Sequence, residues 1–206
     1  MKLTPANFQR YLVFSGFLAG IGFVATWAFH WATTYLQINI PWWLEVPGTL
    51  AIAGFLYSIY HKHAWSWRIF CVLGITDVPD LRGRWEGCIY SSYNQKKESV
   101  PAVVEINQTA SDIQLNLYTA QSFSSSVVAN FSKDSDGATC IYYSYRNETG
   151  RQAVDGMHIH YGSSQMRYHP DIMKLDGHYY TTRDRGNYGE MEFEYKDREL
   201  LYRFKK

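Results

Sequence analysis

Cysteine is scarce in this 206-residue chain, which has only Cys71, Cys88 and Cys140. Their number is odd, and no two of them are spaced as CxxC. Small secreted domains rely on paired cysteines for a disulfide framework. We therefore expect this protein to work in a reducing compartment.

Net charge is also small. The chain has 20 Lys and Arg against 19 Asp and Glu, a net charge of +1. From Arg82 to the end the two groups balance, at 16 each. A protein that binds a nucleic-acid polymer normally carries a large basic excess, so that class of partner is not expected.

Catalytic signatures are missing. The sequence has no GxSxG, no phosphate-binding P-loop, no HRD and no HExxH, and its carboxylates are scattered. His158 and His160 would share a strand face, but no third ligand stands at a spacing diagnostic of a metal site. We expect neither an enzyme nor a bound metal or cofactor.

Charged residues are absent from residues 11–36, where His30 is the single titratable side chain apart from tyrosine. About 20 apolar residues in a helix cross a bilayer core of about 30 Å. The run shows no polar face at the helical period, so it predicts a membrane span. Gly16 and Gly20 are spaced as in GxxxG, and either pack a helix closely or reflect the frequency of glycine in such helices.

A second span is predicted over residues 42–60. Trp42 and Trp43 stand where an aromatic belt belongs, and Pro47 lies in the first helical turn, where proline is tolerated. Glu45 suits an interfacial position at the start of a helix, and a buried functional acid is the alternative.

Residues 64–75 are too short to span, and suit either a helix lying in the membrane interface, with Trp65 and Trp67 as anchors, or a plain linker helix. Basic residues flank the two spans on one side: Lys2, Arg10, Lys62 and Arg68. The positive-inside rule then predicts a multi-pass inner-membrane protein with both termini in the cytoplasm. Residues 1–75 form the membrane unit in this interpretation.

The remaining residues, 76–206, show strand patterns and almost no helical periodicity. We expect eight strands, at 83–92, 102–109, 112–120, 123–132, 138–146, 154–167, 174–182 and 190–196. Short strands joined by tight turns indicate an antiparallel meander. Closing the sheet removes its exposed edges, so we predict a lipocalin-like antiparallel β-barrel.

Alternation along each strand predicts which side chains share a face. Trp85 should point inward, and Arg84 and Glu86 outward. Ile113, Leu115 and Leu117 should share one strand face, and Phe123, Val127 and Phe131 should share another. Either the barrel surface is polar and its lumen apolar, or part of the lumen carries hydroxyls and amides. Which face of each later strand lines the lumen cannot be decided, because tyrosine and threonine suit both.

Tyrosines and arginines suggest a ligand site in the later strands. Tyrosine can stack on bases and donate hydrogen bonds, and arginine can hold phosphates. Cross-strand surface pairs are the alternative for any one residue. Strand parity and side-chain chemistry together select Tyr118, Tyr142, Arg146, His160, Tyr180, Thr182 and Arg183.

The order of parts, two apolar helices, a TDVPDLRGRWEG connector and an all-β domain, resembles a family. With its LRGRWEG entry at residues 81–87, the chain resembles the bacterial anti-phage CBASS effectors that have two transmembrane helices and a β-strand-rich domain and are encoded beside CD-NTases. The resemblance implies a receptor: a cyclic dinucleotide binds the barrel, the protein forms a homo-oligomer, and its helices disrupt the inner membrane and kill the infected cell.

Two other classes stay open from the residues alone. A membrane-anchored carrier of an apolar ligand would have a lumen lined by residues such as Leu115, Leu117, Val127 and Phe131, without arginine. A scaffold protein would have a filled barrel. The base identity of a nucleotide ligand, the oligomer size and the choice between a pore and general lipid disruption are beyond the sequence.

Overall fold

The computed structural model describes residues 5–39, 41–92, 98–149, 159–182 and 186–204. The chain divides into two compact units. The first comprises Met1–Asp77 and the turn Thr109–Ser111, and is helical. The second comprises Val78–Gln108 and Asp112–Lys206, and contains every described β-strand.

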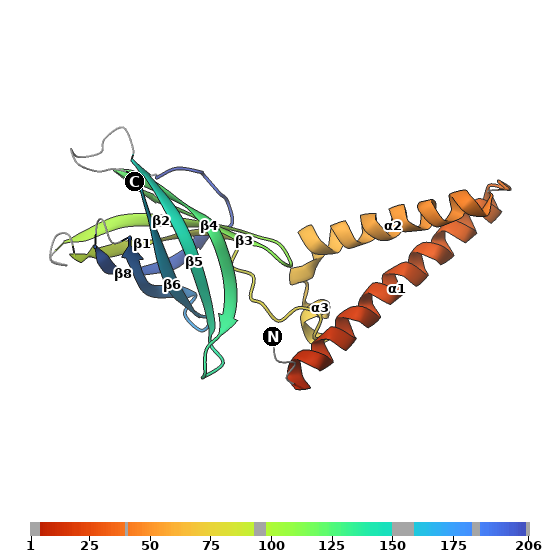
Figure 1. The fold of residues 1–206 in the computed structure, drawn as a ribbon, viewed down its shortest axis with the longest axis horizontal. Helices are drawn as coiled ribbons and strands as arrows, with labels where there is room; N and C mark the ends of the chain where they lie inside the picture. Colours follow the sequence, from red (N-terminus) through yellow and green to blue (C-terminus); the bar gives the residue numbers. More distant parts are fainter. Residues whose placement is uncertain (1–4, 40, 93–97, 150–158, 183–185, 205–206) are drawn as a thin grey trace. The chain divides into compact units, whose positions relative to one another are not determined.

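Two long helices make up most of the helical unit, α1 (Pro5–Tyr35) and α2 (Trp42–Lys62), joined by a short turn (Figure 1). Both predicted helical segments are thus confirmed as helices. An aromatic cluster of Phe17, Tyr60 and Phe70, with ring centroids 4.7 to 5.6 Å apart, packs them against the next short helix. Within the same unit, the Ala110 N–H donates to the His61 carbonyl at 3.0 Å.

Over the described residues, neither α1 nor α2 combines the length with the apolar character needed to cross a bilayer, so the two predicted membrane spans and the multi-pass topology are not supported. Ser15, Thr26 and His30 stand among the apolar side chains of the described part of α1. Some residues used in the prediction have side chains outside the described set: Tyr11, Trp42, Trp43 and Glu45.

The two helices nevertheless expose large apolar side chains, among them Phe23, Trp27, Trp31 and Phe55. A Cβ added at Gly16 or Gly20 would meet no described atom within 4 Å, so the GxxxG face is not a close contact with α2.

The predicted interfacial helix over 64–75 is two short pieces instead, η1 (Ala64–Ser66) and α3 (Arg68–Val72). They are separated at Trp67, whose backbone is extended, with φ −68° and ψ 140°. Trp65 is fully buried and Trp67 is exposed, so only Trp67 presents its ring at the surface as an anchor would.

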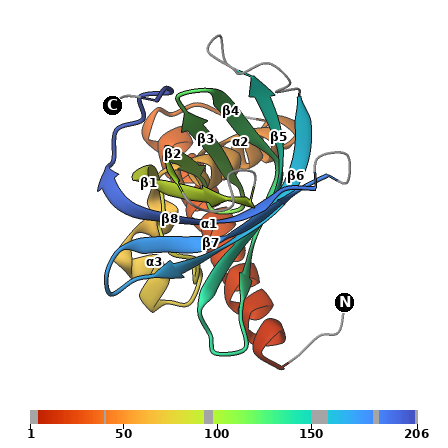
Figure 2. The same ribbon diagram turned by 90° about the vertical axis from the view of Figure 1, so that its left-hand side faces the viewer.

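The second unit is a closed antiparallel barrel in which the strands follow in sequence order and β8 returns to pair with β1 (Figures 1 and 2). This confirms the predicted eight-stranded barrel. The strands are β1 (Gly83–Ser91), β2 (Ser99–Gln108), β3 (Ile113–Thr119), β4 (Ser122–Lys133), β5 (Thr139–Thr149), β6 (His160–His169), β7 (Lys174–Thr181) and β8 (Tyr188–Asp197).

Alternate side chains of the strands point into the barrel, as the period of two requires. Trp85 is fully buried and points inward, as predicted, and it packs edge-on against Tyr195 at 5.3 Å between centroids. The predicted apolar face of β3 also lies inside, with Ile113, Leu115 and Leu117 in or against the core.

The face predicted for β4 is wrong. The register of β4 against β5 shifts between Ser126 and Val128, so the strand contains an extra residue there. A β-bulge of this kind moves the following side chains to the opposite face. Phe131 therefore packs against the core, whereas Val127 is 63% exposed and Phe123 lies beside the outward Tyr118.

Candidate ligand-binding site

The inside of the barrel changes character along its length. One end is filled by buried apolar side chains, including Trp85, Ile106, Ile141, Met166 and Phe193. At the other end, where β5 finishes and β6 begins, small or polar side chains take several inward positions, beside the apolar Leu117 that pairs with Ser124. We call this the polar end and define it by Ser124, Tyr145, Asn147, Gly162, Ser164 and Tyr179.

Tyr143 and Ser164 mark the transition between the two ends. They are cross-strand partners on β5 and β6, and both are buried. The Ser164 hydroxyl donates to the His178 carbonyl at 3.0 Å. Burial raises the pKa of Tyr143 to about 12, so its phenol stays protonated and remains a hydrogen-bond donor at neutral pH.

Two tyrosines of the polar end lie opposite glycines. Tyr145 pairs with Gly162 across β5 and β6, and Tyr179 pairs with Gly189 across β7 and β8. A Cβ on either glycine would collide with its partner's ring. Glycine thus lets each ring lie against the neighbouring backbone, and the Tyr145 hydroxyl donates to the Tyr180 carbonyl at 3.5 Å.

An amide and a hydroxyl lie next to these rings. The Asn147 Nδ2 donates to the Ser124 Oγ at 2.7 Å, and both residues are buried. Asn147 pairs in turn with His160 at the start of β6. His160 has the same parity as Ser164 and Met166, so it belongs to the inner face of that strand.

The structure describes six of the seven predicted ligand residues, and these six lie on different surfaces. His160 alone among the described ones lies on the inner face. Outward parity applies to Tyr118, Tyr142, Arg146 and Tyr180. Thr182 follows β7 at the surface, and Arg183 lies outside the described residues. The predicted pairs Tyr142–Arg146 and Tyr180–Thr182 therefore do not line the lumen.

The described lysine and arginine side chains lie away from the inner wall of the polar end. Arg146 points outward and forms an ion pair with Glu148 at 3.2 Å. Within the described part of the chain, no lysine or arginine occupies an inward position at the polar end. A phosphate bound there would meet hydroxyl and amide donors of the strands.

Sequence reasoning missed Ser124, Asn147 and Ser164 because it could not assign the inner face. A usable signal exists in β5, where Ile141 fixes the parity: the residues that alternate with it are Tyr143, Tyr145 and Asn147. Ser124 could not have been found this way, because the bulge later in β4 reverses the parity that Phe131 suggests.

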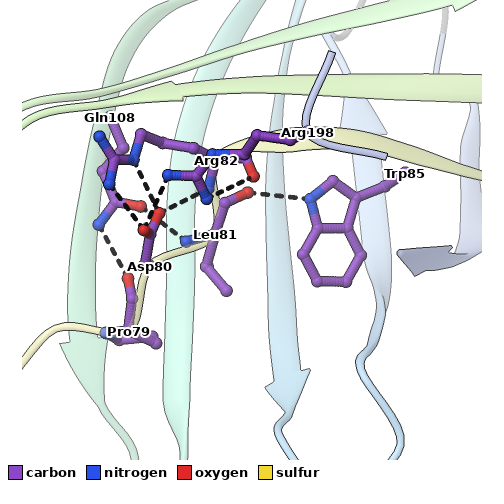
Figure 3. Close-up of polar contacts among 7 residues, drawn as sticks. All are labelled: Pro79, Asp80, Leu81, Arg82, Trp85, Gln108 and Arg198. Atoms are coloured by element: carbon purple, nitrogen blue, oxygen red, sulfur yellow. Dashed lines mark hydrogen bonds and ion pairs between the residues drawn. The ribbon is translucent and has the colours of Figure 1, made fainter. Parts of the chain in front are cut away.

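The connector that enters the barrel is fixed by its side chains, and we call this arrangement the connector clamp. It consists of Pro79, Asp80, Leu81, Arg82, Trp85, Gln108 and Arg198 (Figure 3). Gln108 bonds at both ends of its amide: Oε1 accepts from the Leu81 N–H at 2.9 Å, and Nε2 donates to the Pro79 carbonyl at 2.9 Å. Trp85 Nε1 donates to the Leu81 carbonyl, also at 2.9 Å.

Asp80 is the charged centre of the connector clamp. Its carboxylate accepts hydrogen bonds from Arg82 at 2.7 Å and 2.8 Å and from Arg198 at 3.0 Å. Burial alone would raise the pKa of Asp80, but the two guanidinium groups outweigh that effect and lower its pKa to about 2.

A buried ion pair lies on the outer side of β1 and β2. Arg84 points outward, as predicted, and so does Glu105, yet their side chains are only 3% and 1% exposed, and they meet at 3.0 Å. The segment after β8 covers them: the backbone N–H groups of Leu201 and Tyr202 donate to the Glu105 carboxylate at 2.8 Å and 2.9 Å. We call residues 198–204 the C-terminal strap.

The fold and the inner wall define a class: a closed antiparallel barrel whose interior is apolar at one end and lined by tyrosine, serine and asparagine at the other. Such barrels hold one small ligand. The chain belongs to the Cap15 family, because residues 76–195 match the family described as "Cap15, cyclic dinucleotide receptor domain". The barrel is therefore a cyclic dinucleotide receptor domain, and the predicted kinship with CBASS anti-phage effectors is confirmed.

A curated relative shares nearly the whole length. The chain is 29% identical over 203 residues to CD-NTase-associated protein 15 from Yersinia aleksiciae. The match covers 92% of this chain and 91% of the relative, so the similarity includes the helical unit as well as the barrel.

Proposed function

We propose that this protein is an effector of anti-phage defence in which a cyclic dinucleotide binds the polar end of the barrel and triggers assembly. The observation that carries the proposal is the inner wall of buried hydroxyl and amide groups beside Tyr145 and Tyr179, within a domain of the Cap15 family. Aromatic rings suit the two bases, and neutral donors suit the two phosphates.

Calorimetric titration of the full-length protein with a panel of cyclic dinucleotides tests the binding step. We expect at least one member to bind, and Tyr145→Ala to weaken it at least ~10-fold through lost stacking. Tyr142→Ala is the matched control, because Tyr142 is on the same strand but points outward. Absence of binding to the whole panel would refute the proposal.

The helical unit is proposed as the output. Its exposed apolar side chains, such as Phe23, Trp27 and Phe55, form a surface that water solvates poorly. Cover by a second copy or by lipid would remove that cost. A ligand can drive this change only through a higher affinity for the assembled state than for the free one.

Vesicles with a trapped dye test the output. The vesicles have the lipid composition of the inner membrane and contain the protein. We propose that added ligand causes the protein to form oligomers, which crosslinking detects, and that dye is then released. Oligomers without release would separate assembly from membrane disruption and remove the second step from the proposal.

The carrier of an apolar ligand remains the second candidate, favoured by one observation. Leu115, Leu117 and Phe131 do lie in or against the core, while Val127 does not. A fluorescent apolar probe that is displaced by a fatty acid but not by any cyclic dinucleotide would favour the carrier.

A further inference from the structure

One polar atom inside the barrel has no partner among the described residues. Asn147 is 7% exposed, and its Nδ2 is occupied by the Ser124 hydroxyl at 2.7 Å. Its Oδ1 is buried and accepts no hydrogen bond from the described chain. Buried amide oxygens in native proteins are almost always satisfied, so each exception calls for an explanation.

The surroundings hold this oxygen in place. Asn147 lies between Ser124 on β4 and His160 on β6 in the sheet register, and the hydrogen bond to Ser124 holds the amide against the barrel wall. Ser124 Oγ accepts that bond, which leaves the serine hydroxyl hydrogen able to donate. The pair therefore presents an acceptor and a donor side by side.

A donor next to an acceptor is the pattern on the Watson–Crick edge of a nucleobase. We propose that Asn147 is the specificity-determining residue that reads one base of the bound cyclic dinucleotide, with Oδ1 accepting from an amino or imino N–H of that edge. This inference rests on the proposed function of the polar end. It adds which residue reads a base, and through which base group.

The experiment uses the full-length protein and the cyclic dinucleotide that binds it most tightly in the panel. Asn147→Leu should lower the affinity at least ~10-fold, the loss expected for an unpaired hydrogen-bonding group. Its unfolding temperature should change little, because leucine has a similar size and the lost bond to the Ser124 hydroxyl is offset by removal of a buried unpaired carbonyl. Asn116→Leu is the control: Asn116 lies on the outer side of β3, so the affinity should not change.

A ligand-side test needs no variant. An analogue in which the read base lacks its Watson–Crick N–H donor, such as purine in place of adenine, should bind the wild-type protein at least ~10-fold more weakly. Asn147→Leu should bind the analogue and the parent ligand equally, because the two losses remove the same hydrogen bond.

Equal affinity of wild type and Asn147→Leu for the parent ligand would overturn the assignment, as would equal affinity of the wild-type protein for parent and analogue at both bases. In either case the wild-type protein still binds, so the proposed function survives. If the wild-type protein binds no member of the panel, the proposed function itself fails.

Discussion

At the scale of single residues, the stability of the barrel unit depends on charged side chains. The alternation along a strand predicts which face such a side chain is on, but it does not predict whether the side chain is buried. The sequence predicts that Arg84, between Gly83 and Trp85, faces solvent. It is outward, yet it is covered by the C-terminal strap and paired with Glu105. The loss of stability when such a residue is substituted depends on the groups that it contacts, and not on which face of the strand it occupies.

Arg84→Met should destabilise the protein by about 3–5 kcal/mol, because it leaves the buried Glu105 carboxylate without a compensating charge. Chemical denaturation measures the change. Glu86→Gln is the matched control: Glu86 also pairs with Arg84, at 2.9 Å, but its side chain is 41% exposed. We expect that control to cost about 1 kcal/mol or less. A similar cost for both variants would contradict the burial argument.

Asp80 gives a prediction about pH. Its pKa is lowered to about 2 in the folded protein from an ordinary value of 3.8, so the folded state favours the ionised form. The resulting stability is complete above about pH 4 and is lost as the pH falls toward about 2. Asp80→Asn should therefore unfold more easily than the wild type at neutral pH, by about 1–2 kcal/mol.

The same two proteins should differ little near the folded-state pKa of Asp80, where the wild-type carboxylate becomes protonated. Urea unfolding at neutral pH, at about pH 4 and at about pH 2.5 measures the difference. A constant difference across this range would show that the substituted amide changes packing and not charge.

At the scale of elements, the connector clamp makes the residues before β1 part of the barrel. A single side chain, Gln108, satisfies both Leu81 and Pro79 from the last residue of β2. With a flexible linker, a conformational change of the barrel would not affect the helical unit. A linker held by hydrogen bonds can transmit a conformational change of β2, and we propose the connector clamp as the route by which ligand binding affects the helical unit.

Gln108→Leu should leave the buried Leu81 N–H unpaired and cost about 2 kcal/mol of stability. We expect the cyclic dinucleotide affinity to stay close to that of the wild type, because Gln108 lies away from the polar end, while ligand-driven assembly weakens. Calorimetry and crosslinking measure the two effects separately. Gln114→Leu on the outer side of β3 is the control, and equal assembly in both variants would argue against the route.

At the scale of the whole molecule, we propose that a sensor and an output share one chain. A ligand present at about 100 times its Kd stabilises the state that binds it by about 2.7 kcal/mol. If the ligand also drives assembly, the unfolding temperature with ligand should rise with protein concentration. Without ligand it should be independent of concentration. Scanning fluorimetry over a wide range of protein concentration tests this, and concentration-independent curves in both conditions would count against ligand-driven assembly.

The sequence alone determined the helices, the strands and the closed barrel. Apolar runs and period-two alternation are local properties, and eight short strands joined by short turns have few ways to bury one face. The sequence also indicated the family, through the connector before the first strand and the order of the helical and β-strand parts. The prediction that both helices span a membrane is not supported by the described helices.

Only the tertiary structure decided which strand faces look inward and which distant residues meet. A single bulge in β4 reverses its parity, and no local pattern shows it. Glu105 binds backbone groups 96 and 97 residues later in the chain, and Asn147 meets Ser124 across the sheet. Tyrosine, serine and asparagine suit either side of a strand, so closure of the barrel was needed to separate an inward residue such as Asn147 from an exposed one such as Tyr142.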